Sequence, residues 1–382
     1  MHQPEKAEKK VEYLELIYDL IFVFVIGRNN LLVHHFSGGF IDGGMFAAYT
    51  VCTLAVIQIW SFTTYYINIF GRNGLREHIS LFINMFLMYF IAEGTSADYD
   101  KYYIQYHIAW ALILCNIGVQ YLIELRNHKG NETLCSQVRK MAVPLFAEAV
   151  LVIGAMLAYE FADIELSWLA IIAGILISVL TGRKSEGVKV DFPHLTERAM
   201  LYVVFTFGEM IIGLSGYFDG VSANGIYFSL MAFLIVVGLF VTYETLYDHI
   251  VDREQNNSGL AYMLIHVFLI FAMNNITSAL EFMREDEIDI MPKMLFLVGS
   301  LLLFFVCIFL LGRYAKKRCR VNKKLIAVMA VSAVCFSVLM ILLREHMKIN
   351  ILLTVAYVFG VFVTIHIFGR QQKELKNDKS EV

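Results

Sequence analysis

Apolar runs of about twenty residues recur along almost the whole 382-residue chain, and they limit the fold more than any other feature. A run of this length crosses a bilayer as an α-helix, whereas a transmembrane barrel would show alternating segments of about ten residues. The charged share of 17% also lies below the soluble average of about 25%. We therefore predict an all-α polytopic transmembrane bundle of twelve spans, at 13–36, 44–68, 77–96, 102–124, 141–160, 165–182, 198–217, 223–247, 258–283, 291–312, 324–343 and 350–369.

The distribution of Lys and Arg supports this span count and gives an orientation. With a cytoplasmic N-terminus, the predicted inside segments hold 25 of the 31 Lys and Arg residues and the outside segments hold 6. Loops rich in these residues stay on the cytoplasmic side. We therefore expect a multi-pass protein of the cytoplasmic membrane with both termini inside. The lipid bilayer is its expected partner, and no motif favours nucleic-acid binding.

The connections between the predicted spans are too short to hold a soluble catalytic domain, and the chain contains no GxxxxGK[ST] or GxGxxG phosphate cradle. Any activity must therefore lie within the membrane bundle. The break at Gly182–Pro193 divides the chain into two six-span halves, 1–182 and 183–382. Because six is even, such halves would be parallel repeats about an axis along the membrane normal.

Three carboxylates lie at the entrance of the first span. Glu12, Glu15 and Asp19 are three and four residues apart, so a helix places them on one face. A carboxylate at the edge of the hydrocarbon core costs several kcal/mol unless it is protonated, paired or facing water. The pattern therefore indicates a functional or pairing role.

The seventh span contains a second group of this kind, with Gly208 beside its deepest carboxylate. Spacings of four, four, three and four residues place five side chains on one helical face: His194, Arg198, Tyr202, Phe205 and Glu209. A glycine such as Gly208 lets another backbone approach closely. We expect Arg198 near the cytoplasmic edge and Glu209 near the middle of the bilayer.

Both groups resemble signature blocks of the bacterial low temperature requirement A (LtrA) family. The stretch Glu15–Ile26 is similar to its N-terminal pattern E-L-x-x-D-L-x-F-V, and H-x-x-E-R at 194–198 with a downstream G-E is similar to its second block. The resemblance implies a bacterial inner-membrane protein linked by name to growth in the cold, and it implies no particular activity. The motif positions carried over are Glu15, Asp19, His194, Glu197, Arg198, Gly208 and Glu209.

If the first and seventh spans are neighbours, Glu15 and Arg198 lie at similar depth and can form an ion pair that offsets the cost of burying both. Asp19 lies one turn deeper and has no obvious partner in the sequence. Two interpretations remain open: a structural clamp, or a gate or ion site made of Glu15, Asp19, Arg198 and Glu209.

Other polar residues inside the spans are secondary candidates. An acidic ladder with histidine can form a cation or proton route, as in transporters, whereas Asn and Thr more often make hydrogen bonds between helices. Asn84 is an example of the second kind. The secondary candidates for an ion or proton site are Glu148, Glu244, His266 and Glu281.

We predict neither a metal site nor a cofactor. His34–His35 and His194 with Glu197 lack further ligands at suitable spacing. The 6 Cys residues are scattered without a CxxC pair, as expected for reduced thiols.

The leading functional hypothesis is a secondary transporter or channel-like permease for a small solute or ion, coupled to protons through Glu15, Asp19 and Glu209. An enzyme is the less favoured class. The alternatives are an intramembrane enzyme or a lipid- or quinone-associated protein, and a structural or stress-adaptation protein without turnover. The solute and the oligomeric state do not follow from the sequence.

Overall fold

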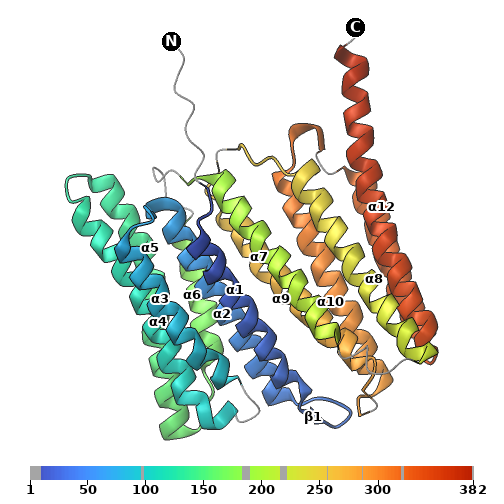
Figure 1. Ribbon diagram of the computed structural model, residues 1–382, viewed down its shortest axis with the longest axis horizontal. Helices are drawn as coiled ribbons and strands as arrows, with labels where there is room; N and C mark the ends of the chain where they lie inside the picture. The colour runs from blue at the N-terminus through green and yellow to red at the C-terminus, as the bar shows by residue number, and fades with distance from the viewer. Residues whose placement is uncertain are drawn as a thin grey trace. The chain divides into compact units, whose positions relative to one another are not determined.

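The computed structural model describes residues 10–95, 99–182, 190–215, 222–255, 257–285, 287–319 and 322–380. These residues form an all-α bundle with one short hairpin, which confirms the predicted fold class (Figure 1). The α-helices are α1 (Tyr13–Asn29), α2 (Gly43–Phe70), α3 (Leu75–Gly94), α4 (Tyr99–Asn127), α5 (Glu132–Ala162), α6 (Ser167–Gly182), α7 (Phe192–Gly213), α8 (Ala223–Thr245), α9 (Leu260–Phe282), α10 (Ile290–Leu311), α11 (Lys323–Leu342) and α12 (Met347–Ser380).

Each predicted span corresponds to one of these helices. In the described part of the chain, ten helical segments are long and apolar enough to cross a membrane. The other two are α6, which has only 16 residues, and α7, which carries Glu197, Arg198 and Glu209. A multi-pass membrane protein is therefore established, while the count of twelve spans stays a prediction.

The chain forms two compact units, and the described residues of the first fall within Met1–His35, Gly43–Tyr202 and Asn256–Met263. Within this unit α3 packs on α4, α4 on α5 and α5 on α6. Helix α1 contacts α2 and α3, and α2 contacts α4 and α6. Helix α2 is therefore central to the unit, and its polar side chains lie among several neighbours.

The second unit comprises the described parts of Phe36–Asp42, Val203–Gln255 and Leu264–Val382. Helix α8 lies beside α12, which also contacts α11, and α10 contacts α11 (Figure 1). Short elements join these helices: η3 (Leu246–Ile250), a π-helical turn that continues α8, and the 3₁₀ turns η4 (Gly312–Tyr314) and η5 (Lys317–Cys319). A β-bridge between Val251 and Ala315 ties two of the connections together.

The hairpin of the second unit consists of β1 (Phe36–Ser37) and β2 (Phe40–Ile41). Its turn residues Gly38 and Gly39 have φ of 60° and 83°, a backbone conformation that glycine adopts readily. A side chain at Gly39 would overlap the carboxylate of Asp289, whose backbone N–H donates to Gly39 O at 2.7 Å. The hairpin is thereby attached to the start of α10.

These units differ from the predicted halves, since α7 and α9 each contribute residues to both units and the boundary within α7 falls after Tyr202. The division into parallel six-span repeats at 182/183 stays a prediction. Much of the surface is apolar: α11 buries only Phe336 and Met340, while Val331 is 63% and Leu342 is 72% exposed. Such surfaces are suited to lipid chains.

Candidate functional site

Helices α1 and α7 bring four ionisable side chains of the first unit together. Glu15 and Asp19 are one turn apart on α1, and His194 and Arg198 are one turn apart on α7. All four are buried, with Asp19 and Arg198 fully inaccessible to solvent. We call these four residues the charge cluster.

Arg198 is the centre of the charge cluster. Its Nη1 donates to Glu15 Oε2, its Nη2 donates to Asp19 Oδ1, and its Nε donates to Asp19 Oδ2 at 3.1 Å. The contact with Asp19 is bidentate, the geometry in which a guanidinium binds a carboxylate most strongly. The predicted pairing of Glu15 with Arg198 is therefore present in the structure.

Asp19, for which the sequence offered no partner, has the larger set of donors. Besides two bonds from Arg198, it accepts a hydrogen bond from Trp60 Nε1 of α2 at 2.8 Å. The Trp60 ring packs on Tyr202, with 4.3 Å between ring centroids. Asp19 is consequently fixed by three hydrogen-bond donors, whereas Glu15 accepts only one hydrogen bond from Arg198.

His194 is oriented by Asn68 of α2. The Asn68 amide oxygen accepts from the Asp191 N–H at 3.0 Å, so its amide nitrogen is the atom facing His194 Nδ1, also at 3.0 Å. An amide N–H is a donor, so this contact calls for an acceptor at Nδ1. The other ring nitrogen, Nε2, lies 3.5 Å from Glu15 Oε2.

The charge cluster contains two carboxyls for one guanidinium, with the His194 imidazole beside Glu15. When both carboxyls are ionised, Arg198 balances only one of their two negative charges. A buried net charge is expensive unless a proton or a cation compensates it. Because the groups interact strongly, such a proton belongs to the cluster as a whole rather than to one carboxyl.

A pocket of about 270 Å³ borders the charge cluster at Glu15. Glu12 and Glu77 line the same pocket, as does Arg72. Glu77 caps the start of α3, where it accepts from the backbone N–H groups of Arg72 at 2.8 Å and Gly74 at 3.1 Å. The pocket is therefore acidic, and Glu15 is the member of the charge cluster that it reaches.

The two other motif residues of α7 lie outside these contacts. Glu197 is half-buried, and no described residue forms an ion pair with it. Gly208 is exposed, and a methyl group there would meet no described atom within 4 Å. Close packing of α7 against α9 occurs instead at Gly213, where a methyl group would lie 2.8 Å from Thr277 Cγ2 and 3.2 Å from Glu281 Oε1.

The second unit contains a separate pair of acids. Glu209 of α7 and Glu281 of α9 are both half-buried and close enough for their charges to interact. His266 is buried and bonds to the Tyr243 hydroxyl at 3.0 Å, whereas Glu244 is exposed. The secondary candidates of this unit therefore do not form one continuous site in the described residues.

Polar residues of α2 were missed as site residues in the sequence. Asn68 and Trp60 both contact the charge cluster, and Gln58 of the same helix donates to Glu148 at 2.8 Å. The sequence pattern that could have identified them is the one used for α1, namely polar side chains within an otherwise apolar run. Asn84 behaves as expected for an interhelical hydrogen bonder, since it donates to the Tyr18 hydroxyl at 3.2 Å.

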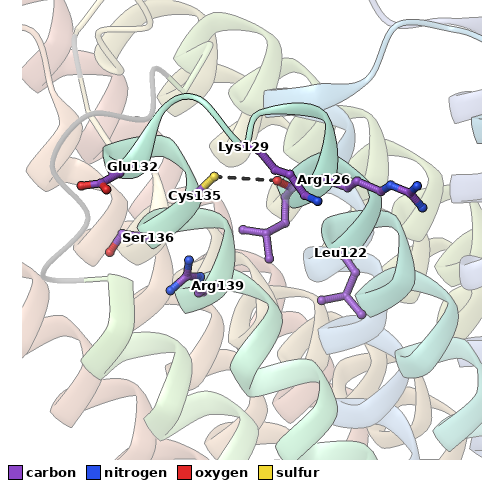
Figure 2. A pocket seen from close by; sticks show the side chains of 8 residues that line it. Leu122, Arg126, Lys129, Glu132, Cys135, Ser136 and Arg139 are labelled. Atoms are coloured by element: carbon purple, nitrogen blue, oxygen red, sulfur yellow. Dashed lines mark hydrogen bonds between the residues drawn. The ribbon is translucent and has the colours of Figure 1, made fainter.

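A larger, open pocket of about 750 Å³ lies where α4 ends and α5 begins (Figure 2). Its cations are Arg126, Lys129 and Arg139, with Glu132 as the one acid. All four side chains are exposed, so solvent screens their charges. This connection is one of the Lys- and Arg-rich segments that suggested the orientation of the chain, and it lies apart from the charge cluster.

Metal ligation finds no support in the described ranges, where no group of three or more His, Cys, Asp or Glu side chains is arranged around a common point.

Comparison with known proteins is informative at the family level. No curated protein and no solved structure matches the chain. The model of the bacterial low temperature requirement A protein (LtrA) family, however, matches residues 10–360, a range that includes both signature blocks and the charge cluster. The chain belongs to the bacterial LtrA family.

Proposed function

We propose that this protein is a secondary transporter or channel-like permease of the bacterial cytoplasmic membrane, with both termini in the cytoplasm. It moves a small solute or ion, and proton binding at the charge cluster drives or gates that movement. The observation that carries the proposal is a buried cluster with two carboxyls for one guanidinium that borders a pocket.

Proton coupling is supported by the arrangement of Glu15. This carboxyl pairs with Arg198 and also lines the acidic pocket, so a proton or small cation arriving from the pocket meets it first. Binding of one positive charge would neutralise the cluster and weaken the hold of Arg198 on the carboxylates. Membrane transporters commonly use acid and histidine groups in this way.

A structural clamp between α1 and α7 is the second candidate, favoured by the bidentate grip of Arg198 on the fully buried Asp19. Replacement of Arg198 by Met destabilises the protein under either function, so the flux measured per amount of folded protein distinguishes them. A clamp alone leaves the flux of the remaining folded protein unchanged, whereas the permease proposal expects that flux to be lost.

The test of transport itself is reconstitution of the purified protein into liposomes that contain a pH-sensitive dye, with a panel of ions and metabolites added outside. The proposal expects at least one added compound to produce a protein-dependent pH change. Glu209→Gln examines the second acidic pair in the same assay. Absence of flux for the wild-type protein across the panel would contradict the proposal.

A further inference from the structure

Glu148 has a buried carboxyl that is not part of the charge cluster. It lies near the middle of the 31-residue α5 and is fully inaccessible to solvent. Its Oε2 accepts a hydrogen bond from Gln58 Nε2 at 2.8 Å. No cation in the described chain pairs with it, in contrast to Glu15 and Asp19.

The groups that face Glu148 from the helices around it are Gln58 of α2, Trp110 of α4 and Gly174 of α6, and none of them is ionisable. The Trp110 indole lies near the carboxyl but its N–H does not reach hydrogen-bonding geometry. A side chain at Gly174 would overlap both Glu148 and Gln58. Among the described residues the carboxyl is therefore surrounded by neutral groups, and none of them would supply a counter-charge to its ionised form.

Two buried oxygen atoms without hydrogen-bond partners among the described residues indicate that Glu148 carries a proton. Glu148 Oε1 and Gln58 Oε1 are both buried, and neither has a hydrogen-bond partner among the described residues. Both are acceptors while the carboxyl is ionised. A proton on Glu148 Oε1 turns it into a donor, for which Gln58 Oε1 is an acceptor of the right kind. An acid and an amide joined in this way form a ring of two hydrogen bonds.

We propose that Glu148 is a second proton-binding site of this protein, a neutral carboxylic acid held by Gln58 as an acid–amide pair. The proton on Oε1 bonds to Gln58 Oε1, and Gln58 Nε2 donates to Oε2. This site is independent of the charge cluster and does not depend on the transport proposal. It places a proton carrier inside the α2, α4, α5 and α6 group of helices.

Infrared spectroscopy of the lipid-embedded protein at pH 7 tests the site directly. The C=O stretch of a protonated carboxyl is separate from the bands of ionised carboxylates and of the backbone. The difference between wild type and Glu148→Gln should contain this protonated band. Glu160→Gln is the matched control, because Glu160 is exposed on the same helix and its removal should leave the protonated band unchanged. A difference spectrum with carboxylate bands only would overturn the proposal.

A thermal measurement gives a second readout. An exposed glutamate loses its proton above about pH 4.3, so a folded state that retains it becomes less stable as the pH rises. The amide introduced by Glu148→Gln can still pair with Gln58 and does not titrate. The melting temperature of wild type should therefore fall relative to Glu148→Gln between about pH 5 and 8. A relative rise would show an ionised, stabilised carboxylate and contradict the proposal.

The Gln58→Leu variant keeps the inference testable if Glu148→Gln does not fold. Loss of the amide leaves the acid without its partner, so the protonated band should persist and move to higher frequency. An unchanged band position would contradict the acid–amide pair, and the absence of a protonated band in wild type would contradict the site altogether.

Discussion

Replacement of Arg198 by Met should be among the most destabilising single changes in the first unit. The substitution keeps an unbranched side chain of similar length but removes all three donors that bind Glu15 and Asp19. Both carboxylates then stay buried without a cation. Breaking a buried ion pair from one side costs about 3–5 kcal/mol, a large part of a total stability of about 5–15 kcal/mol.

The origin of this cost can be isolated with a double-mutant cycle. If uncompensated charge is responsible, Asp19→Asn in the Arg198→Met background removes one of the two orphaned carboxylates. The double variant should then be more stable than Arg198→Met alone, with a coupling energy of about 0.5–3 kcal/mol. Asp19→Asn in the wild-type background should instead destabilise, because it weakens two hydrogen bonds from Arg198 and one from Trp60.

Denaturant unfolding in detergent micelles, with the yield of folded protein as a second readout, measures all four members of the cycle. Additive losses in the double variant would refute the argument, because they would show that Arg198 acts through packing alone. A wild-type level of stability in Arg198→Met would refute the burial of the pair itself.

Four further substitutions, one of them a control, test local packing, each by its melting temperature. Trp60→Phe should cost about 1–3 kcal/mol because Asp19 loses a buried donor, and an unchanged stability would argue against that hydrogen bond. Gly174→Ala should cost about 1–3 kcal/mol through overpacking, whereas Gly154→Ala, with no described atom within 4 Å, should be neutral or stabilising by up to about 1 kcal/mol; equal effects would contradict the crowding at Gly174. Gly259→Ala should cost at least about 1 kcal/mol because its φ is +67°, and tolerance would show that this turn relaxes freely.

Much of the fold was predictable from the sequence because bilayer length and hydrophobicity leave few alternatives. Each predicted span corresponds to a helix. The limits of the longest helices were less predictable: α5 begins at Glu132 rather than near 141, because its first turns are polar and extend beyond the apolar run. α12 likewise continues to Ser380, past the predicted end at 369.

The charge cluster was partly predictable, since residues four apart on a helix share a face whatever the tertiary structure. The pairing of Glu15 with Arg198 was predicted from their similar expected depth in the membrane. The third helix of the site could not be derived, because the contribution of Trp60 and Asn68 depends on how α2 packs against α1 and α7. For the same reason no partner for Asp19 could be identified from the sequence. In the structure Asp19 accepts three hydrogen bonds, and Glu15 is the carboxyl that lines a pocket.

The glycine of α7 that lies against a neighbouring helix was not identified from the sequence. Gly208 precedes Glu209 and has an open face among the described residues, whereas Gly213 lies against Thr277 and Glu281. A five-residue shift rotates the position by more than a third of a turn, since successive residues are about 100° apart on a helix of about 3.6 residues per turn. Sequence spacing identifies the helix face but does not identify its neighbour.

The central claim, that the charge cluster exchanges a proton during transport, is tested most directly by proton flux in proteoliposomes that contain Glu15→Gln. Glu12→Gln is the matched control, because Glu12 lines the same pocket but does not bond to Arg198. At equal amounts of folded protein, the account predicts that Glu15→Gln loses the pH-dependent flux while Glu12→Gln keeps it. Equal flux in Glu15→Gln and wild type would contradict the account.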